Sequence, residues 1–460
     1  MSRYLVAPLY IPFEPKLCAL RRSTTAQKPC FPVIHSTADR PSSDAARRSA
    51  HYQPNMWSND YIQSLAVESP VEEKDQSTAR IVLLKERIRK VISEKKEVEE
   101  QLQLIDHLQQ LGVAYHFKDD IKDALTSIHG SLEDIISLQL NDTDVHVTAL
   151  LFRLLRENGF SITDDIFKRF RDENGQFFEV SVEGMMSLYE AAFYGKDGEV
   201  MLQEVIDFTT KHLRNLLNQG SITEPDLKQK VSHALELPLN WRLERLHTRW
   251  FIQFCSQSNK DKCSTINPLL LEFAKLDFNR VQDTHKNELS KLSRWWSDLG
   301  LAQDLPFFRD RLMTNYLSTV GCAFEPEYWN FREIETKANC FITMLDDVYD
   351  VYGDLEELEK FTDAIQRSDG PSAIHCLMQE KDVSEAEARE MIKEMIMTNW
   401  RAMNGDRVNC TTLFEENFKI CAINLDRTAQ FFYRDTDRYS ETDREIMDSV
   451  TSLLVEPIEL

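Results

Sequence analysis

The sequence predicts an all-α protein, and two observations lead to this prediction. Glycine accounts for only 13 of the 460 residues. Leu, Glu, Lys, Arg and Ala dominate the chain and recur at the spacing of a helical turn. Such a composition is typical of helical proteins. A chain of this length allows about two or three domains, each with a sizeable hydrophobic core.

Charge and hydropathy narrow the possible classes of function. The formal net charge is −22, which argues against nucleic-acid binding through a general basic field. A phosphorylated ligand would therefore need local cations or a bridging metal ion. The sequence contains no run of about eighteen apolar residues and predicts no membrane span. The nine cysteines form no CxxC pair, which predicts reduced and mostly buried thiols.

The N-terminal residues differ in kind from the rest of the chain. Residues 1–48 contain eight Arg or Lys and only three acidic residues, together with many Ser, Thr and Pro. This composition is typical of a removable organellar transit peptide, and a disordered tail is the alternative. We expect residues 1–46 to be the transit segment.

Helical periodicity begins near Thr78 and predicts amphipathic helices joined by short polar breaks. Ser161 to Thr163, followed by acidic residues, predicts a helix N-cap. A stripe of large apolar side chains is expected in the core, formed by Met185, Met186, Tyr189 and Phe193. The expected helices of the first half are 79–95, 102–117, 119–130, 145–160, 162–172, 183–195 and 198–217, followed by aromatic helices within 236–254.

A polar loop at 256–267 marks the expected boundary between two domains. We place an N-terminal domain with a structural role at 47–260 and a C-terminal domain at 261–460. Helices at 267–296 and 305–321 open the second domain. The first of them is expected to bury an apolar face formed by Leu270, Phe273, Leu276 and Val281.

Three aspartates interrupt an apolar helical stretch between Thr336 and Gly353. Asp346 and Asp350 point from the same side of the helix, with Asp347 about 100° around it. Carboxylates near a helix C-terminus repel each other and oppose the helix dipole, which favours a bound cation. Oxygen ligands without His or Cys suit Mg²⁺. A solvated acidic turn is the alternative, and the apolar neighbours disfavour it.

Two arginines precede these aspartates. Arg309 and Arg311 lie 37 and 35 residues before Asp346, and a helical bundle can bring all three to one site. The arginines either form an ion-pair network with the aspartates or clamp a diphosphate, whose oxygens match the donors of a guanidinium group. The spacing leaves both interpretations open.

Together with other motifs, these residues resemble the plant class I terpene synthases. The match runs from Arg47 to Ala364 and is closest to the monoterpene synthase group that has a tandem-arginine/tryptophan motif and a plastid transit peptide. The segments that carry it are RRSAHYQPNMW, LLFRLLRENGF, SLYEAAFYG, ALELPLNWRLERLHTRWF, EFAKLDFN, SRWW, FFRDR and DDVYDVYG followed by ELEKFTDAI.

The resemblance implies an N-terminal α-barrel and a C-terminal α-bundle of the class I terpenoid synthase type. It also implies a monomeric chloroplast lyase that ionises geranyl diphosphate with Mg²⁺ (or Mn²⁺) and releases a monoterpene and diphosphate. By this resemblance the metal ligands are Asp346, Asp347 and Asp350, the residues that hold the departing diphosphate are Arg309 and Arg311, and the segment that caps the substrate is represented by Arg47, Arg48 and Trp57.

One departure from the family pattern is large. The second metal motif, (N/D)DxxSxxxE or its Thr variant, occurs nowhere in the sequence. Residues 360–367 resemble the segment just after the first motif, whereas 368–404 resemble a segment that normally follows the second. We infer an internal deletion near 367–371. It would remove one wall of the pocket and the opposing ligands, leave apolar helix faces without partners, and make activity weak or absent.

The remaining departures are smaller. Ser318 stands where the family often has Trp, so it offers no aromatic face to a carbocation. Asp354 stands where Thr is usual and adds charge near the metal motif. Asp435 and Asp437 match the acidic residues of the family's closing loop only loosely, and a solvated turn is the alternative.

Other functions remain open. A sesquiterpene synthase acting on farnesyl diphosphate is disfavoured by the tandem-arginine motif and the basic leader. A chain-elongating prenyl transferase would need a second aspartate-rich motif and a shorter chain. From a different class, the alternative is a non-catalytic protein that binds prenyl diphosphates, or an inactive splice isoform. The sequence does not predict the product or its stereochemistry.

Overall fold

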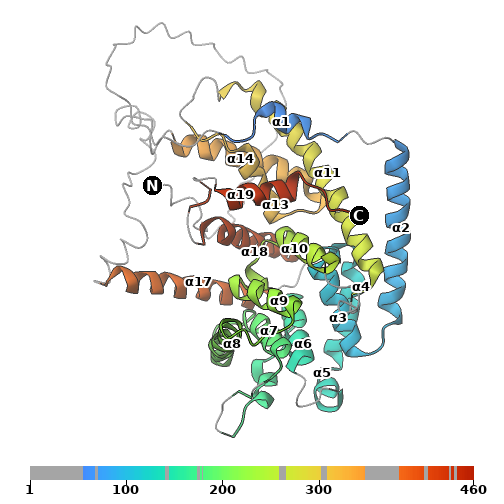
Figure 1. The fold of residues 1–460 in the computed structure, drawn as a ribbon, viewed down its shortest axis with the longest axis vertical. Coiled ribbons are helices and arrows are strands. Elements are labelled where there is room, and N and C mark those ends of the chain that lie inside the picture. The colour runs from blue at the N-terminus through green and yellow to red at the C-terminus, as the bar shows by residue number, and fades with distance from the viewer. Residues whose placement is uncertain are drawn as a thin grey trace, which may run out of the picture.

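The chain is helical throughout the part that the structure describes (Figure 1). Within that part, the only β pairing is an isolated bridge between Arg171 and Phe177, and no helix has the length and hydropathy to cross a membrane. The predicted all-α class is confirmed. The computed structural model describes residues 55–67, 71–139, 145–173, 177–178, 180–257, 266–301, 308–347, 383–408, 413–434, 437–439 and 443–460.

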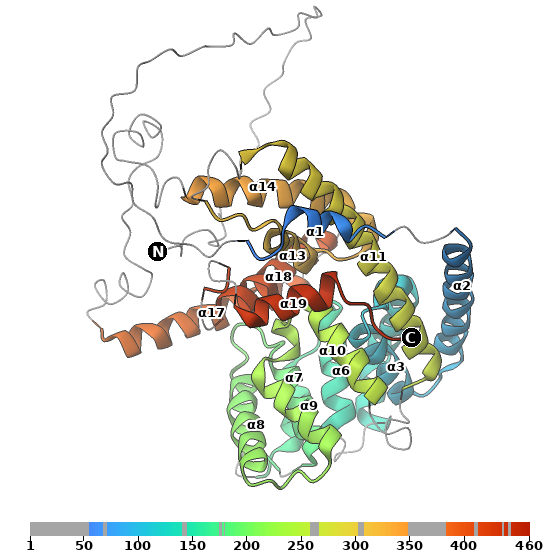
Figure 2. The same cartoon turned by 45° about the horizontal axis from the view of Figure 1, so that its top comes forward.

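Most helices of the first half gather at one end of the molecule, and those of the second half gather at the other (Figures 1 and 2). The α-helices of the first half are α1 (Asn59–Ser64), α2 (Val71–Glu94), α3 (Val98–Gln110), α4 (Lys118–Gly130), α5 (Leu132–Asp134), α6 (Val145–Glu157), α7 (Val182–Ala192), α8 (Val200–Asn218), α9 (Pro225–Glu236) and α10 (Glu244–Gln257). Its short 3₁₀ or π segments are η1 (Ala114–Phe117), η2 (Ile135–Gln139), η3 (Asp164–Phe170) and η4 (Leu239–Trp241).

The second half begins with the longest helix of the described residues, α11, which spans 31 residues. It packs against α1, α2, α10, α13, α14 and α19 and so joins the two halves. The elements of this half are α11 (Pro268–Asp298), α13 (Leu312–Cys322), η5 (Pro326–Tyr328), α14 (Trp329–Asp347), α17 (Glu385–Val408), α18 (Leu413–Tyr433) and α19 (Arg444–Leu454).

The predicted core residues lie inside. Met185 and Tyr189 are buried in a small cluster of α7 to α9, with Met186 and Phe193 packed against it. The predicted apolar face of α11 belongs to the main hydrophobic core, which extends through both halves of the molecule. The expected boundary at residue 260 lies in 258–265, outside the described residues.

Two predicted helices differ from the structure, and another helix was missed. The helix expected at 102–117 stops at Gln110 of α3, and its last residues form η1. The helix expected at 162–172 is the short 3₁₀ segment η3, and Thr163 precedes it without a side-chain capping hydrogen bond. Gly159 ends the preceding turn with φ of 81°, a conformation that favours glycine. Helix α9 was missed, although Pro225 at its first turn is a typical helix start.

The N-terminal segment crosses to the C-terminal half. Ser293 Oγ on α11 donates a hydrogen bond to the Asn59 carbonyl oxygen at 3.3 Å. The Val67 amide donates to Asn287 Oδ1, also on α11, at 3.0 Å. Because each bond joins residues more than 200 positions apart, α1 is held along α11 rather than on its sequence neighbours (Figure 2).

The C-terminus is tied to both halves by side chains that bond its last carbonyls. Gln282 of α11 donates from Nε2 to the carbonyl oxygens of Leu453 and Glu456 at 3.0 and 2.9 Å. Arg249 of α10 donates to the same Glu456 oxygen at 2.5 Å. The last carbonyls of a helix lack partners within the helix, so these two side chains fix the end of α19 between the halves.

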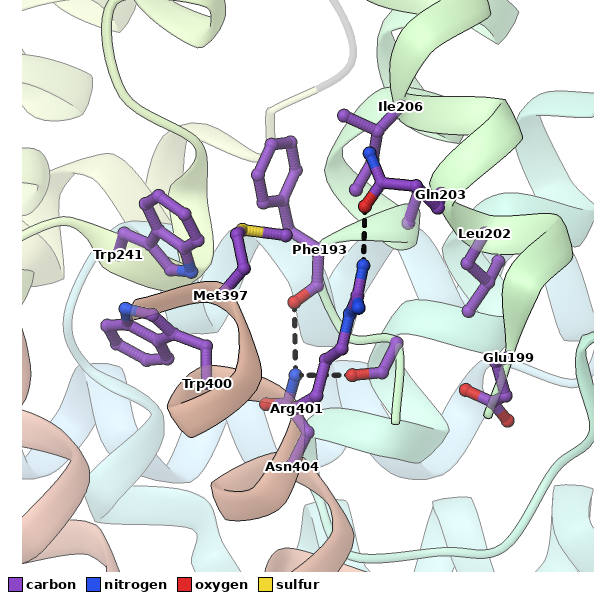
Figure 3. A pocket seen from close by; sticks show the side chains of 12 residues that line it. Phe193, Glu199, Leu202, Gln203, Ile206, Trp241, Met397, Trp400, Arg401 and Asn404 are labelled. Atoms are coloured by element: carbon purple, nitrogen blue, oxygen red, sulfur yellow. Dashed lines mark hydrogen bonds between the residues drawn. The ribbon is translucent and has the colours of Figure 1, made fainter. Parts of the chain in front are cut away.

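Helix α17 anchors its second half on the N-terminal domain (Figure 3). Asn404 Nδ2 donates to the carbonyl oxygens of Phe193 and Gly195 at 3.1 and 3.0 Å. Trp400 stacks on Trp241 with ring centroids 5.5 Å apart. The cavity left between these residues measures only about 10 Å³, room for about one water molecule. The contact is therefore a packed interface and leaves no space for a ligand.

We expect Asn404→Ala to weaken this anchor. The change leaves the Gly195 carbonyl without its side-chain donor, whereas the Phe193 carbonyl keeps a hydrogen bond from Asn240 Nδ2 at 3.2 Å. The lost bond costs roughly 1–3 kcal/mol of the free energy of unfolding. Urea denaturation followed by circular dichroism measures the loss. Thr398→Ala, an exposed position on the same helix, is the matched control and should change stability by less than about 0.5 kcal/mol. Equal effects of both changes would contradict the anchoring role.

Candidate active site

Arg309 and the aspartates at the end of α14 meet directly. The Arg309 backbone amide and Nε donate to the two carboxylate oxygens of Asp347 at 2.5 and 2.8 Å. Arg309 Nη2 donates to Asp346 Oδ2 at 2.5 Å and lies 2.7 Å from Asp347 Oδ1. The structure thus brings Arg309, Asp346 and Asp347 together. These contacts are those of the ion-pair network, one of the two interpretations that the spacing left open, and the diphosphate clamp stays a prediction.

The contact between Arg309 and Asp347 is buried inside the protein. The Arg309 and Asp347 side chains are fully inaccessible to solvent, whereas that of Asp346 is 18% exposed. Burial raises the pKa of Asp347, and the hydrogen bonds from Arg309 oppose that rise. A buried charge needs a partner with good geometry. Arg309 is such a partner for Asp347, while Asp346 keeps some access to solvent.

Trp296 of α11 holds the segment before α13 and so sets the direction of the Arg309 side chain. Phe308 packs edge-on against Trp296 of α11, with ring centroids 6.0 Å apart. Asp310 accepts a hydrogen bond from Trp296 Nε1 at 3.0 Å. Trp296 thus fixes both neighbours of Arg309, and the Arg309 side chain between them points to the aspartates.

Arg311 is also buried but has a different set of contacts. It precedes the first turn of α13, and its Nη1 donates to the Asp310 carbonyl oxygen at 3.4 Å. Burial lowers the pKa of its guanidinium, and the nearby positive charge of Arg309 lowers it further. An anion bound beside Arg311 would relieve both effects, which suits a diphosphate group.

A buried polar network supports the site from the C-terminal segment. The hydroxyl groups of Tyr439 and Thr343 are hydrogen-bonded at 2.6 Å, and Tyr439 also donates to Asn315 Oδ1. Thr343 lies one turn before Asp347 on α14, and Asn315 lies in the first turn of α13. Burial raises the pKa of Tyr439, so it remains a neutral donor. Sequence reasoning missed these residues, although the spacing of Thr343 from Asp347 hinted at a shared face.

A second network joins the helices beneath the site. Arg332 of α14 donates to both Glu288 oxygens, each at 2.9 Å. Tyr316 of α13 donates to the same carboxylate at 2.6 Å. This fully paired cluster links α11, α13 and α14 through groups that are buried or nearly so. Ser318, noted as a departure from the family, is only partly buried on α13.

Two further predicted residues lie in the described part of the chain, and the others lie outside it. Trp57 is partly buried against the main core beside α1, and Asp437 is partly exposed. The remaining predicted residues outside the described part of the chain are Arg47, Arg48, Asp350, Asp354 and Asp435, and the expected deletion near 367–371 also lies outside it.

The donor set agrees with a hard divalent cation at one aspartate. Asp346 offers a partly exposed carboxylate, and oxygen ligands suit Mg²⁺ or Mn²⁺. Asp347 has both oxygens bound to Arg309. The part of the chain described here contains no cluster of three or more possible metal-binding side chains. Asp346 therefore fits the expected metal better than Asp347 does.

Comparison with known proteins identifies the family. "Monoterpene synthase 8, chloroplastic" from Hedychium coronarium is 46% identical to this chain in an alignment that covers 100% of both proteins. The family model "Terpene synthase, N-terminal domain" matches residues 56–235, and the family model "Terpene synthase family, metal binding domain" matches residues 297–372. The chain belongs to the terpene synthase family. Such enzymes are lyases that act on prenyl diphosphates and depend on divalent metal.

Solved terpene synthases share the fold. A limonene synthase with 2-fluorolinalyl diphosphate is 26% identical, with a TM-score of 0.78 over 90% of this chain and 100% of the other. The isoprene synthase of grey poplar (Populus x canescens), in complex with three Mg²⁺ ions and dimethylallyl-S-thiolodiphosphate, is 27% identical. Its TM-score is 0.75 over 88% of this chain and 99% of that one.

The alignment also gives a difference in length. It spans 600 positions, although this terpene synthase has only 460 residues, so at about 140 positions the Hedychium protein has residues and this chain has none. The match to the metal-binding domain ends at residue 372.

We expect Arg309→Met to destabilise this terpene synthase strongly. The change leaves Asp347 buried without its counter-ion, which costs roughly 3–5 kcal/mol of the free energy of unfolding. Thermal or urea unfolding measures the loss. Arg444→Met, at a side chain that is 90% exposed, is the control and should have little effect. A variant as stable as the unmodified protein would show that Arg309 is not the counter-ion of Asp347.

Proposed function

We propose that the chain is a monoterpene-type synthase whose substrate is geranyl diphosphate and whose metal is Mg²⁺ (or Mn²⁺). We further propose that its activity is weak or lost because an internal segment with the second metal motif is missing. The observation that carries the proposal is the buried contact of Arg309 with Asp346 and Asp347. One side of a diphosphate site is thus retained in a chain that lacks the motif expected opposite.

Two facts support the proposal that a segment is missing from this chain. Relative to the Hedychium protein, about 140 aligned positions have no residue here. The metal-binding domain match ends at residue 372, beside the join near 367–371 that the motif order predicts. A deletion at this place removes helices from the middle of the catalytic domain and leaves α17, α18 and α19 at its end.

The retained residues suit the first step of the reaction. Ionisation of an allylic diphosphate builds negative charge on the leaving group. Arg309 and Arg311 are buried cations, and in this proposal they are the groups that stabilise that charge. Asp346 and Asp350 would hold a divalent ion, and that ion would polarise the oxygens of the diphosphate. Asp347 serves to hold Arg309 in place, because both of its oxygens accept from that arginine.

The name of the Hedychium relative favours a monoterpene product, and so does the match of Arg47, Arg48 and Trp57 to the tandem-arginine motif. Farnesyl diphosphate is the less favoured substrate because that motif and the basic leader are both present. A non-catalytic protein that binds prenyl diphosphates remains the second candidate, since the buried arginines do not depend on turnover. Metal-dependent binding of a non-hydrolysable diphosphate analogue without product formation would favour it.

Activity measurements test the proposal directly. We expect the purified chain with geranyl diphosphate and Mg²⁺ to form little or no terpene. We expect a chimera that receives the roughly 140-residue segment of Monoterpene synthase 8 at residues 367–371 to gain at least about a hundredfold in kcat/KM, about 2.7 kcal/mol in transition-state stabilisation.

The chimera carries its own control. Asp346→Asn in the chimera should abolish the gain, because it removes a ligand of the restored metal site. Robust terpene formation by the unmodified chain would contradict the proposed loss of activity. Sequencing the transcript across the codons for residues 360–372 shows separately whether the short form is expressed.

We also propose that the protein is a monomer that acts in the plastid. Monoterpene synthase 8 is called chloroplastic, and residues 1–46 have the composition of a transit peptide. Import into isolated chloroplasts should shorten the full-length chain by about 46 residues. A chain without residues 1–46 is the control and should remain outside. Import of both forms, or of neither, would contradict the role of the leader.

A further inference from the structure

Helix α14 presents a row of large apolar side chains that are partly exposed to solvent. One of them, Phe341, also packs edge-on against Trp295 and Trp296 of α11, with ring centroids 5.9 and 6.1 Å apart. Ile334, Phe341 and Leu345 recur at helical spacing, and with Ile342 they form a stripe along one side of the helix. Their exposed fractions are 66% for Ile334, 37% for Phe341, 41% for Ile342 and 42% for Leu345. We call these four residues the α14 stripe. A single exposed apolar residue is ordinary, but an aligned row of large ones marks an interaction surface.

The opposite side of the same helix is polar and buried. Its inward residues are Arg332, Thr336, Cys340, Thr343 and Asp347. Arg332, Thr343 and Asp347 make the ion pairs and hydrogen bonds described above. Thr336 is hydrogen-bonded to Thr319 of α13 at 3.1 Å, and Cys340 Sγ accepts a hydrogen bond from Asn315 of α13 at 3.3 Å. A helix at the surface of a globular protein normally shows the reverse arrangement. The reversal indicates that α14 belongs between two layers, of which the described residues supply only one.

We propose that the α14 stripe is the docking surface for a helical segment supplied by another chain, equivalent to the roughly 140 residues that Monoterpene synthase 8 has and this chain lacks. The inference rests on the proposed deletion. Its position supports that occupant, because the join near 367–371 follows soon after α14 ends at Asp347. By this placement the missing segment begins only about 20 residues after α14, which keeps it close along the chain to the exposed stripe.

The chemistry of the surface defines the partner. The stripe extends over about 11 residues, or roughly 17 Å of helix, and presents branched and aromatic side chains at the spacing that packs into the groove of another helix. The partner is therefore an amphipathic helix with large apolar residues on one face. Leu345 directly precedes Asp346, so a helix seated here also lies beside the proposed metal site.

The location gives the partner a second role. Asp346 is partly exposed next to the stripe, and a helix on the stripe can bring carboxylates toward the same ion from another direction. Binding of this partner would restore the missing wall and the missing ligands together. The catalytic domain would then be completed in trans rather than within one chain.

Direct binding tests the proposal without using activity. The probe is the roughly 140-residue segment of Monoterpene synthase 8, fused to a soluble carrier and titrated into the full chain by calorimetry. We expect saturable binding that Ile334→Glu weakens at least tenfold. Val200→Glu, at a side chain of α8 that is 69% exposed, is the matched control and should bind normally. Circular dichroism checks that both variants keep the helical fold.

The outcomes separate the explanations. Absence of binding to the folded chain, or equal weakening by both variants, would overturn the docking proposal. Sedimentation that shows a dimer of the chain alone, lost in Ile334→Glu, would also overturn it, because a second copy would then cover the stripe. Terpene formation by the unaided chain would instead contradict the proposed function, whatever the result of the titration.

Discussion

The buried ion pair between Arg309 and Asp347 is the constraint on which the rest of the site depends. Neither charge reaches solvent, and each has the other as a bonded partner. Breaking such a pair costs about 3–5 kcal/mol, which is a large part of the stability of a typical domain. The pair therefore fixes the end of α14 relative to the segment before α13, and Asp346 takes its position from that.

The surrounding helices hold the ion pair between Arg309 and Asp347 in position. Trp296 of α11 holds the residues on either side of Arg309, and the Glu288, Arg332 and Tyr316 cluster joins the three helices beneath. The N-terminal domain supports α11 and also binds α17 through Asn404. These contacts hold Arg309 and α14 in place from the N-terminal domain, α11 and α13.

Charge spacing and helical periodicity are local patterns, so the sequence predicted most helices and the proximity of Arg309 to Asp346, while the roles of these residues stay predictions. Asp346, Arg309 and Arg311 were identified from their positions in the chain, and most helices from their apolar repeat. It could not predict that Asp347 turns inward to Arg309, since that depends on the direction of a segment held by Trp296. The pairing of Tyr439 with Thr343 joins residues 96 positions apart, and no sequence period reports such a contact.

The central claim is that one side of a diphosphate-metal site survives and the other is absent. Crystals grown with Mn²⁺ and a non-hydrolysable geranyl diphosphate analogue allow the metal positions to be counted by anomalous diffraction. The account predicts at most one Mn²⁺ ion, bound beside Asp346, with Arg309 still paired to Asp347. A cluster of three ions, as in the isoprene synthase complex, would contradict it, and so would an Asp346 that lies away from any metal and any phosphate.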